Sequence, residues 1–169
     1  MSDMLSRVAG APITWGADAS AGWGYLMDPA RVMSEMREAG LSATELGPDG
    51  FLPSDPQELK DFVAGYDMSM VGGFVPAILY RDTDMDADIQ YFERASDQLA
   101  AAGASNVVLG PRSHYDGYDT EIDMDDDQWA VFLRTFDAFK TSPKSVDCRP
   151  HYTRTGAWRS RDRIKWIDC

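Results

Sequence analysis

Apolar residues recur along the first 140 residues in two alternating patterns. Four short apolar runs predict buried strands, which begin near residues 11, 43, 68 and 106. Each run is followed by a stretch whose apolar positions lie three or four residues apart, which is the period of an amphipathic helix. Strand starts that are 25 to 38 residues apart are typical of repeated βα units with parallel strands. The pattern therefore predicts four βα units.

The residues at the expected element ends agree with this division. Strands are expected at 11–16, 43–46, 68–74 and 107–109. Two helices begin with an aspartate followed by a proline, at Asp28-Pro29 and Asp55-Pro56, which suit the N-cap and the first helical position. An Ala-Gly pair ends the helix before each of the last three strands, at 39–40, 64–65 and 102–103.

Four βα units fit two architectures. An open doubly wound sheet can be completed by about 150 residues, whereas an eight-fold barrel needs about 250. The chain has 169 residues, so its length favours the open sheet. However, Gly16, Gly22 and Gly24 in the first loop do not have the G-x-G-x-x-G spacing, and no P-loop lysine is present. The apolar pattern leaves both architectures open.

Composition narrows the classes of partner. The net charge of −12 argues against a nucleic-acid partner, because phosphates require a basic surface. No apolar run approaches the ~20 residues of a membrane span, so no membrane partner is expected. The first ten residues lack the apolar region of a signal peptide. A cytoplasmic protein is therefore expected.

Residues 141–169 differ from the rest of the chain. They hold seven Lys and Arg against three Asp, a net charge of +4, and both cysteines, Cys148 and Cys169. Two cysteines in a cytoplasmic protein are more often free thiols than a disulfide. The last helical pattern is cut by Thr141-Ser-Pro143. We therefore expect two parts: residues 1–140, built from βα units, and an irregular basic tail, residues 141–169.

Several motifs follow one another in a fixed order: Ile13-Thr-Trp-Gly16, Gly22-Trp-Gly24, Ala43-Thr-Glu-Leu-Gly-Pro-Asp-Gly50 with Phe51-Leu-Pro53, and Gly72-Gly-Phe-Val-Pro76. Over about residues 8–140, the chain resembles the N-terminal half of inosose dehydratase-like proteins, in the xylose-isomerase-like TIM barrel group of sugar isomerases and epimerases. The resemblance implies an α/β fold: an incomplete barrel of about four βα units plus an irregular tail. It also implies a divalent metal such as Mn²⁺ or Co²⁺ and chemistry on a polyol or keto-sugar.

The resemblance weakens in the tail. Cys148-Arg-Pro-His-Tyr152 is a partial echo of a His-Pro-His-like motif, in which His151 matches the second histidine and Arg149 stands in place of the first. His151 is therefore the metal-ligand candidate, although a histidine that binds no metal is the simpler interpretation. We hypothesise that the tail is a frameshifted or truncated continuation. Because the resemblance places most metal ligands on later strands, which this chain lacks, we expect the chain to be inactive.

Four other residues are candidates for a sugar site. Glu45 ends an apolar strand, where α/β enzymes place polar groups that touch ligands, and could bind substrate or handle a proton. Trp15 and Phe74 could form an apolar wall under a sugar ring, although ordinary core packing also explains them. Trp23 lies in a Gly-rich loop, where core packing is a poor explanation for so large a side chain.

Three functions are consistent with these observations. The first is a sugar isomerase-like or inosose dehydratase-like protein whose partner is a small sugar or polyol. The second is a non-catalytic remnant, or a half barrel that binds a ligand or forms a homo-oligomer. The third is an open-sheet domain with a small ligand at the strand ends.

Overall fold

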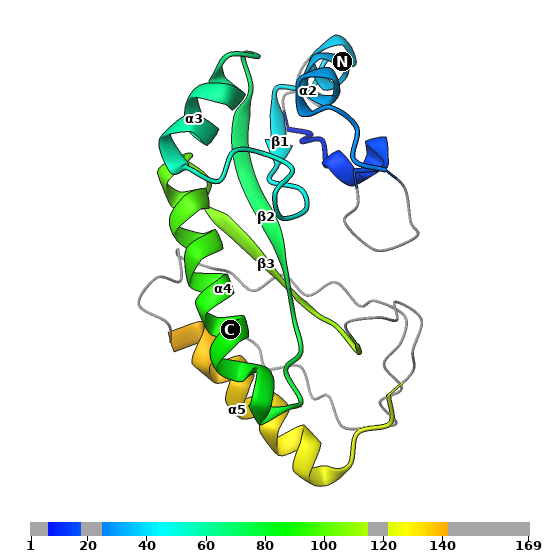
Figure 1. Ribbon diagram of the computed structural model, residues 1–169, viewed down its shortest axis with the longest axis vertical. Helices are drawn as coiled ribbons and strands as arrows, with labels where there is room; N and C mark the ends of the chain where they lie inside the picture. The colour runs from blue at the N-terminus through cyan, green and yellow to red at the C-terminus, as the bar shows by residue number, and fades with distance from the viewer. Residues whose placement is uncertain (1–6, 18–24, 115–121, 142–169) are drawn as a thin grey trace.

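Helices and strands alternate along the chain in the computed structural model, which describes residues 7–17, 25–114 and 122–141 (Figure 1). Three parallel strands lie between α-helices, after a short 3-10 helix. In chain order the elements are η1 (Pro12–Trp15), α2 (Pro29–Glu38), β1 (Ala43–Glu45), α3 (Pro56–Ala64), β2 (Ser69–Ala77), α4 (Asp82–Ala101), β3 (Asn106–Pro111) and α5 (Asp126–Thr141). The predicted α/β class with parallel strands is confirmed. The basic tail lies outside the described residues.

The order of the strands distinguishes the two architectures. The sheet has the order β1-β2-β3, which is also the order of the strands in the chain. Gly10 pairs with the other edge of β1: its N–H donates to the carbonyl of Ala43 (2.8 Å) and its carbonyl accepts from the N–H of Glu45 (2.9 Å). A doubly wound sheet reverses its strand order at a switch point, and no reversal occurs among the described residues. Consecutive parallel neighbours are the arrangement of a (βα)8 barrel.

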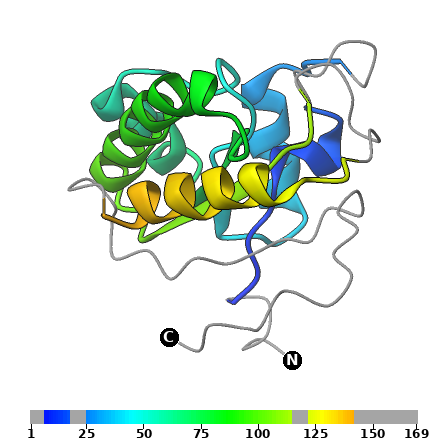
Figure 2. The same ribbon diagram turned by 90° about the horizontal axis from the view of Figure 1, so that it is seen from below.

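Helices cover one side of this sheet. α3 and α4 pack on β2 and on each other, and α5 packs along α4 (Figures 1 and 2). Phe92 of α4 meets Phe139 of α5 nearly edge to face, with ring centroids 5.0 Å apart. The largest fully buried side chains of the main core are Met33, Met36, Leu59, Leu79, Leu99, Val32 and Val75. Burial of these apolar side chains is the main source of the fold's stability.

The expectation of a strand at residues 11–16 is wrong, because these residues form η1. Pro12 has no N–H to donate to a strand, and its fixed φ suits the first position of a helix. Gly16 ends η1 in the left-handed region, at φ +75°, and donates its N–H to the carbonyl of Ile13 (2.9 Å). Pairing with β1 therefore occurs earlier in the chain, at Gly10.

The strand expected at residues 68–74 is β2 in the structure, and it is longer than expected. A loop was expected from Val75, but β2 continues to Ala77 and pairs with β3 along its whole second half. Val75 pairs with Leu109, and both side chains are buried. The added pairs bury apolar surface, which explains why the strand does not end at Phe74.

Both aspartates that were expected to cap helices do so. The Asp28 carboxylate accepts from the N–H of Arg31 (3.1 Å) at the start of α2. The Asp55 carboxylate accepts from the N–H groups of Gln57 and Glu58 (both 2.9 Å) at the start of α3. Each bond satisfies a backbone donor that the helix itself leaves free.

Two adjacent glycines let β2 approach its neighbours closely on both sides. A β-carbon on Gly72 would lie 2.6 Å from the carbonyl oxygen of Asn106 in β3. A β-carbon on Gly73 would lie 3.0 Å from the β-carbon of Leu46 and 3.2 Å from a methyl carbon of Leu99 in α4. The glycine pair therefore sets the distances from β2 to β3 and to the helix layer.

None of the helices in the described ranges is long and apolar enough to cross a membrane.

Gly72→Ala is expected to lower the free energy of unfolding by about 2 kcal/mol or more, because backbone atoms of β3 must move to accommodate the new methyl group. Urea denaturation followed by circular dichroism measures this change. Ser69→Ala, at the exposed start of the same strand, is the control and is expected to change the free energy by less than about 0.5 kcal/mol. Equal stability of the Gly72→Ala variant and the unchanged protein would contradict the close approach.

Candidate functional site

Alternate residues of β2 point to opposite sides of the sheet. Gly73 faces Leu99 of α4, so Gly73 and Val75 lie on the helix side. Gly72, Phe74 and Pro76 therefore lie on the other side, which we call the inner face. Directly paired residues of neighbouring strands share a face. The residues that share the inner face with them are Glu45 of β1 and Asn106, Val108 and Gly110 of β3.

Phe74 presents an aromatic ring on the inner face. Its side chain is 43% exposed. The ring lies over Gly110 of β3, because a β-carbon built on that glycine would be only 1.9 Å from the ring's Cζ. Gly110 is not among the glycines with positive φ, so the backbone conformation does not require a glycine there. The space that its missing side chain leaves is what the ring of Phe74 occupies.

Glu45 is the last residue of β1 and is half-buried. It pairs with Gly72 after a register shift between Thr44 and Glu45, so an irregularity in the ladder precedes the carboxylate. Burial raises the pKa of Glu45 above its usual value. Among the described residues, no hydrogen bond or ion pair to this carboxylate offsets that cost. A carboxylate of this kind is a candidate for binding hydroxyl groups or transferring a proton.

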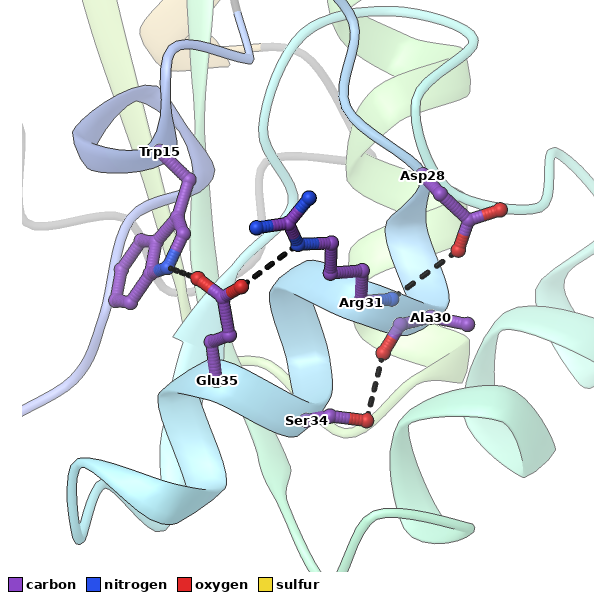
Figure 3. A network of polar contacts seen from close by, with 6 residues as sticks. All are labelled: Trp15, Asp28, Ala30, Arg31, Ser34 and Glu35. Carbon is purple, nitrogen blue, oxygen red and sulfur yellow. Dashed lines mark hydrogen bonds and ion pairs between the residues drawn. The ribbon is translucent and has the colours of Figure 1, made fainter.

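Trp15 belongs to a polar network that links η1 to α2 (Figure 3). Its indole N–H donates to Oε2 of Glu35 (2.9 Å), and Nε of Arg31 donates to Oε1 of the same carboxylate (2.7 Å). The bond from Arg31 is the main reason that the pKa of Glu35 lies below its usual value. Partial burial opposes this lowering, and the bond from Trp15 adds to it. The Trp15 ring is partly buried against the main core.

The structure brings some of the predicted site residues together and leaves others apart. Glu45 and Phe74 share the inner face: Glu45 pairs with Gly72 of β2, and the Phe74 ring lies over Gly110 of β3. No hydrogen bond or ring contact joins Trp15 to either residue, and the indole is held by α2. Trp23 and His151 lie outside the described residues. The roles assigned to all five side chains stay predictions.

The described residues do not fit a metal centre. Within residues 7–17, 25–114 and 122–141, no three His, Cys, Asp or Glu side chains lie close enough together to hold a metal ion. A structural zinc site needs four ligands, and a catalytic one needs three. Glu45 alone on the inner face does not meet either requirement.

Asp88 of α4 is a buried carboxylate that no sequence motif predicts. It is only 8% exposed, and it accepts from the N–H of Ile78, directly after β2 (2.8 Å). Burial raises its pKa, while the bond from Ile78 and the charges of Arg112 and Arg81 oppose that rise. The helical spacing around residue 88 gives no sign that its side chain reaches the end of a strand. Asp88 therefore acts on the structure by holding the segment that follows β2.

A second contact joins the segments after β2 and β3. The hydroxyl of Tyr80 donates to the carbonyl of Ser113 (2.8 Å), and both residues are buried. Ile78, Tyr80 and Met124 form a small separate core against Trp129 and other apolar side chains near the start of α5. The carboxyl ends of β2 and β3 are therefore fixed relative to each other.

Glu45→Gln is expected to raise the melting temperature at about pH 7.5 and to have little effect near pH 3.5. A buried acid with a raised pKa contributes stability below its unfolded pKa, and this contribution is lost as the pH rises through the folded pKa. The glutamine has no charge to bury. Calorimetric scans across this pH range measure the difference, and Glu38→Gln at the exposed end of α2 is the control. A variant that is less stable than the unchanged protein at pH 7.5 would contradict an uncompensated carboxylate.

Comparison with known proteins gives two curated relatives, and no family model matches. The chain is 32% identical to the rhizopine catabolism protein MocC of Rhizobium meliloti over 110 residues. This stretch covers 65% of this chain and 33% of that protein. It is 26% identical to the inosose dehydratase of Geobacillus kaustophilus (strain HTA426) over 113 residues. This stretch covers 65% of this chain and 36% of that enzyme. The chain therefore spans about a third of the length of these relatives.

Two solved structures share the fold. The 3-keto-D-glucoside 4-epimerase of E. coli matches 86% of this chain and 56% of its own, with a TM-score of 0.60 and 10% identity. The D-allulose 3-epimerase of Methylomonas sp., in complex with D-allulose, matches 85% of this chain and 49% of its own, with a TM-score of 0.55 and 17% identity. The chain is thus similar in sequence to MocC and to an inosose dehydratase over about a third of their length, and it shares its fold with part of two sugar epimerases.

Proposed function

We propose that the inner face binds a polyol or keto-sugar beside the end of β1, with Phe74 against the sugar ring and Glu45 against its hydroxyl groups. The observation that carries this proposal is the position of Glu45. A half-buried carboxylate with no ion pair among the described residues shares a face with an exposed aromatic ring.

The two side chains match the two kinds of surface that a sugar presents. The C–H groups of a sugar ring form apolar patches that pack well on an aromatic face. Its hydroxyl groups donate hydrogen bonds that a buried carboxylate otherwise lacks, and bonds to charged groups are the stronger ones. Ligand sites commonly combine an apolar wall with a few polar groups in this way.

Proton transfer is the chemistry that Glu45 is suited to. Epimerisation next to a carbonyl, dehydration of a keto-inositol and isomerisation through an enediol begin with removal of a proton from the carbon beside the carbonyl. A carboxylate whose pKa is raised is a more effective base for this step than an ordinary glutamate. We therefore assign Glu45 the role of general base in whichever of these reactions a full barrel that contains this half carries out.

The family resemblance implies a divalent metal. The described residues do not form a cluster that could hold it, and any ligands must come from other residues. For this chain we therefore propose sugar binding. Turnover is proposed for a protein that also supplies the ligands and the remaining strands of the barrel.

Phe74→Ala is expected to weaken binding of D-allulose or of an inosose about three- to tenfold, which is the usual contribution of one aromatic contact. Glu45→Gln is expected to weaken it through the loss of charged hydrogen bonds. Isothermal titration calorimetry measures both changes. The control is Leu133→Ala, which removes a side chain on α5 that is 54% exposed.

Two results would contradict the proposed site. One is unchanged affinity in both the Phe74→Ala and the Glu45→Gln variants. The other is an equal loss in the Leu133→Ala variant, because a nonspecific effect on the fold would then explain the data. Circular dichroism of each variant shows whether it is folded under the conditions of the titration.

A further inference from the structure

Thr44 is a polar residue in the middle of β1, and its side chain is fully buried, with 0% exposure. Its hydroxyl donates to the main-chain carbonyl of the next residue, Glu45 (3.0 Å). A buried hydroxyl costs stability unless it is hydrogen-bonded, and valine would fill the same space without that cost. The bond to the carbonyl of Glu45 is therefore the reason for a threonine at this position.

The carbonyl of Glu45 needs a side-chain donor because a proline lies opposite it. The N–H of Glu45 donates to the carbonyl of Gly10 (2.9 Å), in a parallel bridge centred on Thr44. The next bond of a parallel ladder would run from the N–H of residue 12 to the carbonyl of Glu45. Pro12 has no N–H, and its ring packs beside this position, because a β-carbon on Gly47 would lie 2.9 Å from its Cγ. The hydroxyl of Thr44 takes the place of the missing donor.

Three hydrogen bonds fix the backbone on both sides of the Glu45 side chain. The first is the bond to Gly10, and the second is the bond from Thr44. The third follows at once, where the N–H of Leu46 donates to the carbonyl of Gly72 (2.9 Å). All three lie at or directly after the register shift between Thr44 and Glu45. An irregularity of this kind changes the direction of a side chain, so the bonds that fix it also set where the carboxylate points.

We propose that Thr44 is a positioning residue for the sugar site: by donating to the carbonyl of Glu45, it fixes the backbone that directs the Glu45 carboxylate onto the inner face. This inference rests on the proposed function of the inner face. Because Thr44 is fully buried, it acts through Glu45 and does not touch the sugar. A carboxylate that is already directed loses less conformational freedom when the sugar binds, and the site is pre-organised to that extent.

Replacement of the hydroxyl by a methyl group tests this role. Thr44→Val is expected to weaken D-allulose binding about threefold or more in isothermal titration calorimetry, as for the loss of one hydrogen bond. It is also expected to lower the pKa of Glu45 toward its usual value, because a carboxylate that is no longer directed can turn into water. Carbon-13 NMR of the side-chain carboxyl measures that pKa without any sugar. Thr44→Ser keeps the hydroxyl and is expected to retain both the affinity and the raised pKa.

Thr135→Val is the matched control. Thr135 of α5 is also fully buried, and its hydroxyl has no hydrogen-bond partner among the described residues. The same substitution therefore removes a buried hydroxyl there without removing a bond. It is expected to change neither the affinity for D-allulose nor the pKa of Glu45.

Two outcomes would overturn the positioning role and leave the sugar site intact. One is a Thr44→Val variant with a lower melting temperature but unchanged affinity and unchanged pKa of Glu45, because the bond would then only stabilise the fold. The other is a Thr44→Ser variant that behaves like Thr44→Val, because the hydroxyl would then not be the cause. If Phe74→Ala and Glu45→Gln leave the affinity unchanged, the proposed function fails. A lowered pKa of Glu45 in Thr44→Val would even then support the role of Thr44 in directing the carboxylate.

Discussion

The close approach of β2 to its neighbours is the constraint on which the described structure depends. Gly72 leaves room for the backbone of β3 on one side, and Gly73 leaves room for Leu99 of α4 on the other. The two glycines weaken the strand itself, because glycine loses the most conformational freedom on folding. In exchange, β2 pairs closely with β3, and the helix layer lies in direct contact with the helix side of β2. The pairing of β2 with β3 and the packing of α4 on β2 therefore both depend on one dipeptide in the middle strand.

This constraint also explains what the inner face presents. Because the helices occupy one side of β2, the alternate residues Gly72, Phe74 and Pro76 must face the other side. Gly110 then accommodates the Phe74 ring, and Glu45 is placed on the same face by its pairing with Gly72. The raised pKa of Glu45 indicates that burying its charge costs stability. Side chains whose placement costs stability are concentrated at functional sites, where the cost is retained for the chemistry.

Local signals made most of the fold predictable from the sequence. Asp28 and Asp55 cap helices as expected, because aspartate is a preferred N-cap residue and proline is preferred at the first helical position. Two of the three expected helix-ending glycines, Gly40 and Gly103, adopt positive φ. At the middle junction, however, the positive φ falls on Asp67 at 53°, two residues after Gly65. The order of the strands in the sheet could be learned only from the structure, since apolar periodicity contains no information on which strands are neighbours.

The predictions that failed did so for two reasons, one local and one that depends on distant residues. Ile13, Thr14 and Trp15 are good strand formers, but Pro12 and Gly16 at their two ends favour a tight helical turn. The partner of Trp15 is a glutamate on a separate helix, and no spacing in the sequence connects the two. Asp88 was missed for the same reason, because its bond to Ile78 joins the middle of α4 to the end of β2.

The central claim is that Phe74 lies on the inner face, over Gly110 and away from the helices. Nuclear Overhauser contacts to the ring protons of Phe74 test it most directly in the chain as it stands. The account predicts strong contacts to the α-protons of Gly110, together with an upfield ring-current shift of those protons. Contacts to the methyl groups of Leu99 in α4 instead would place the ring on the helix side and contradict the inner face itself.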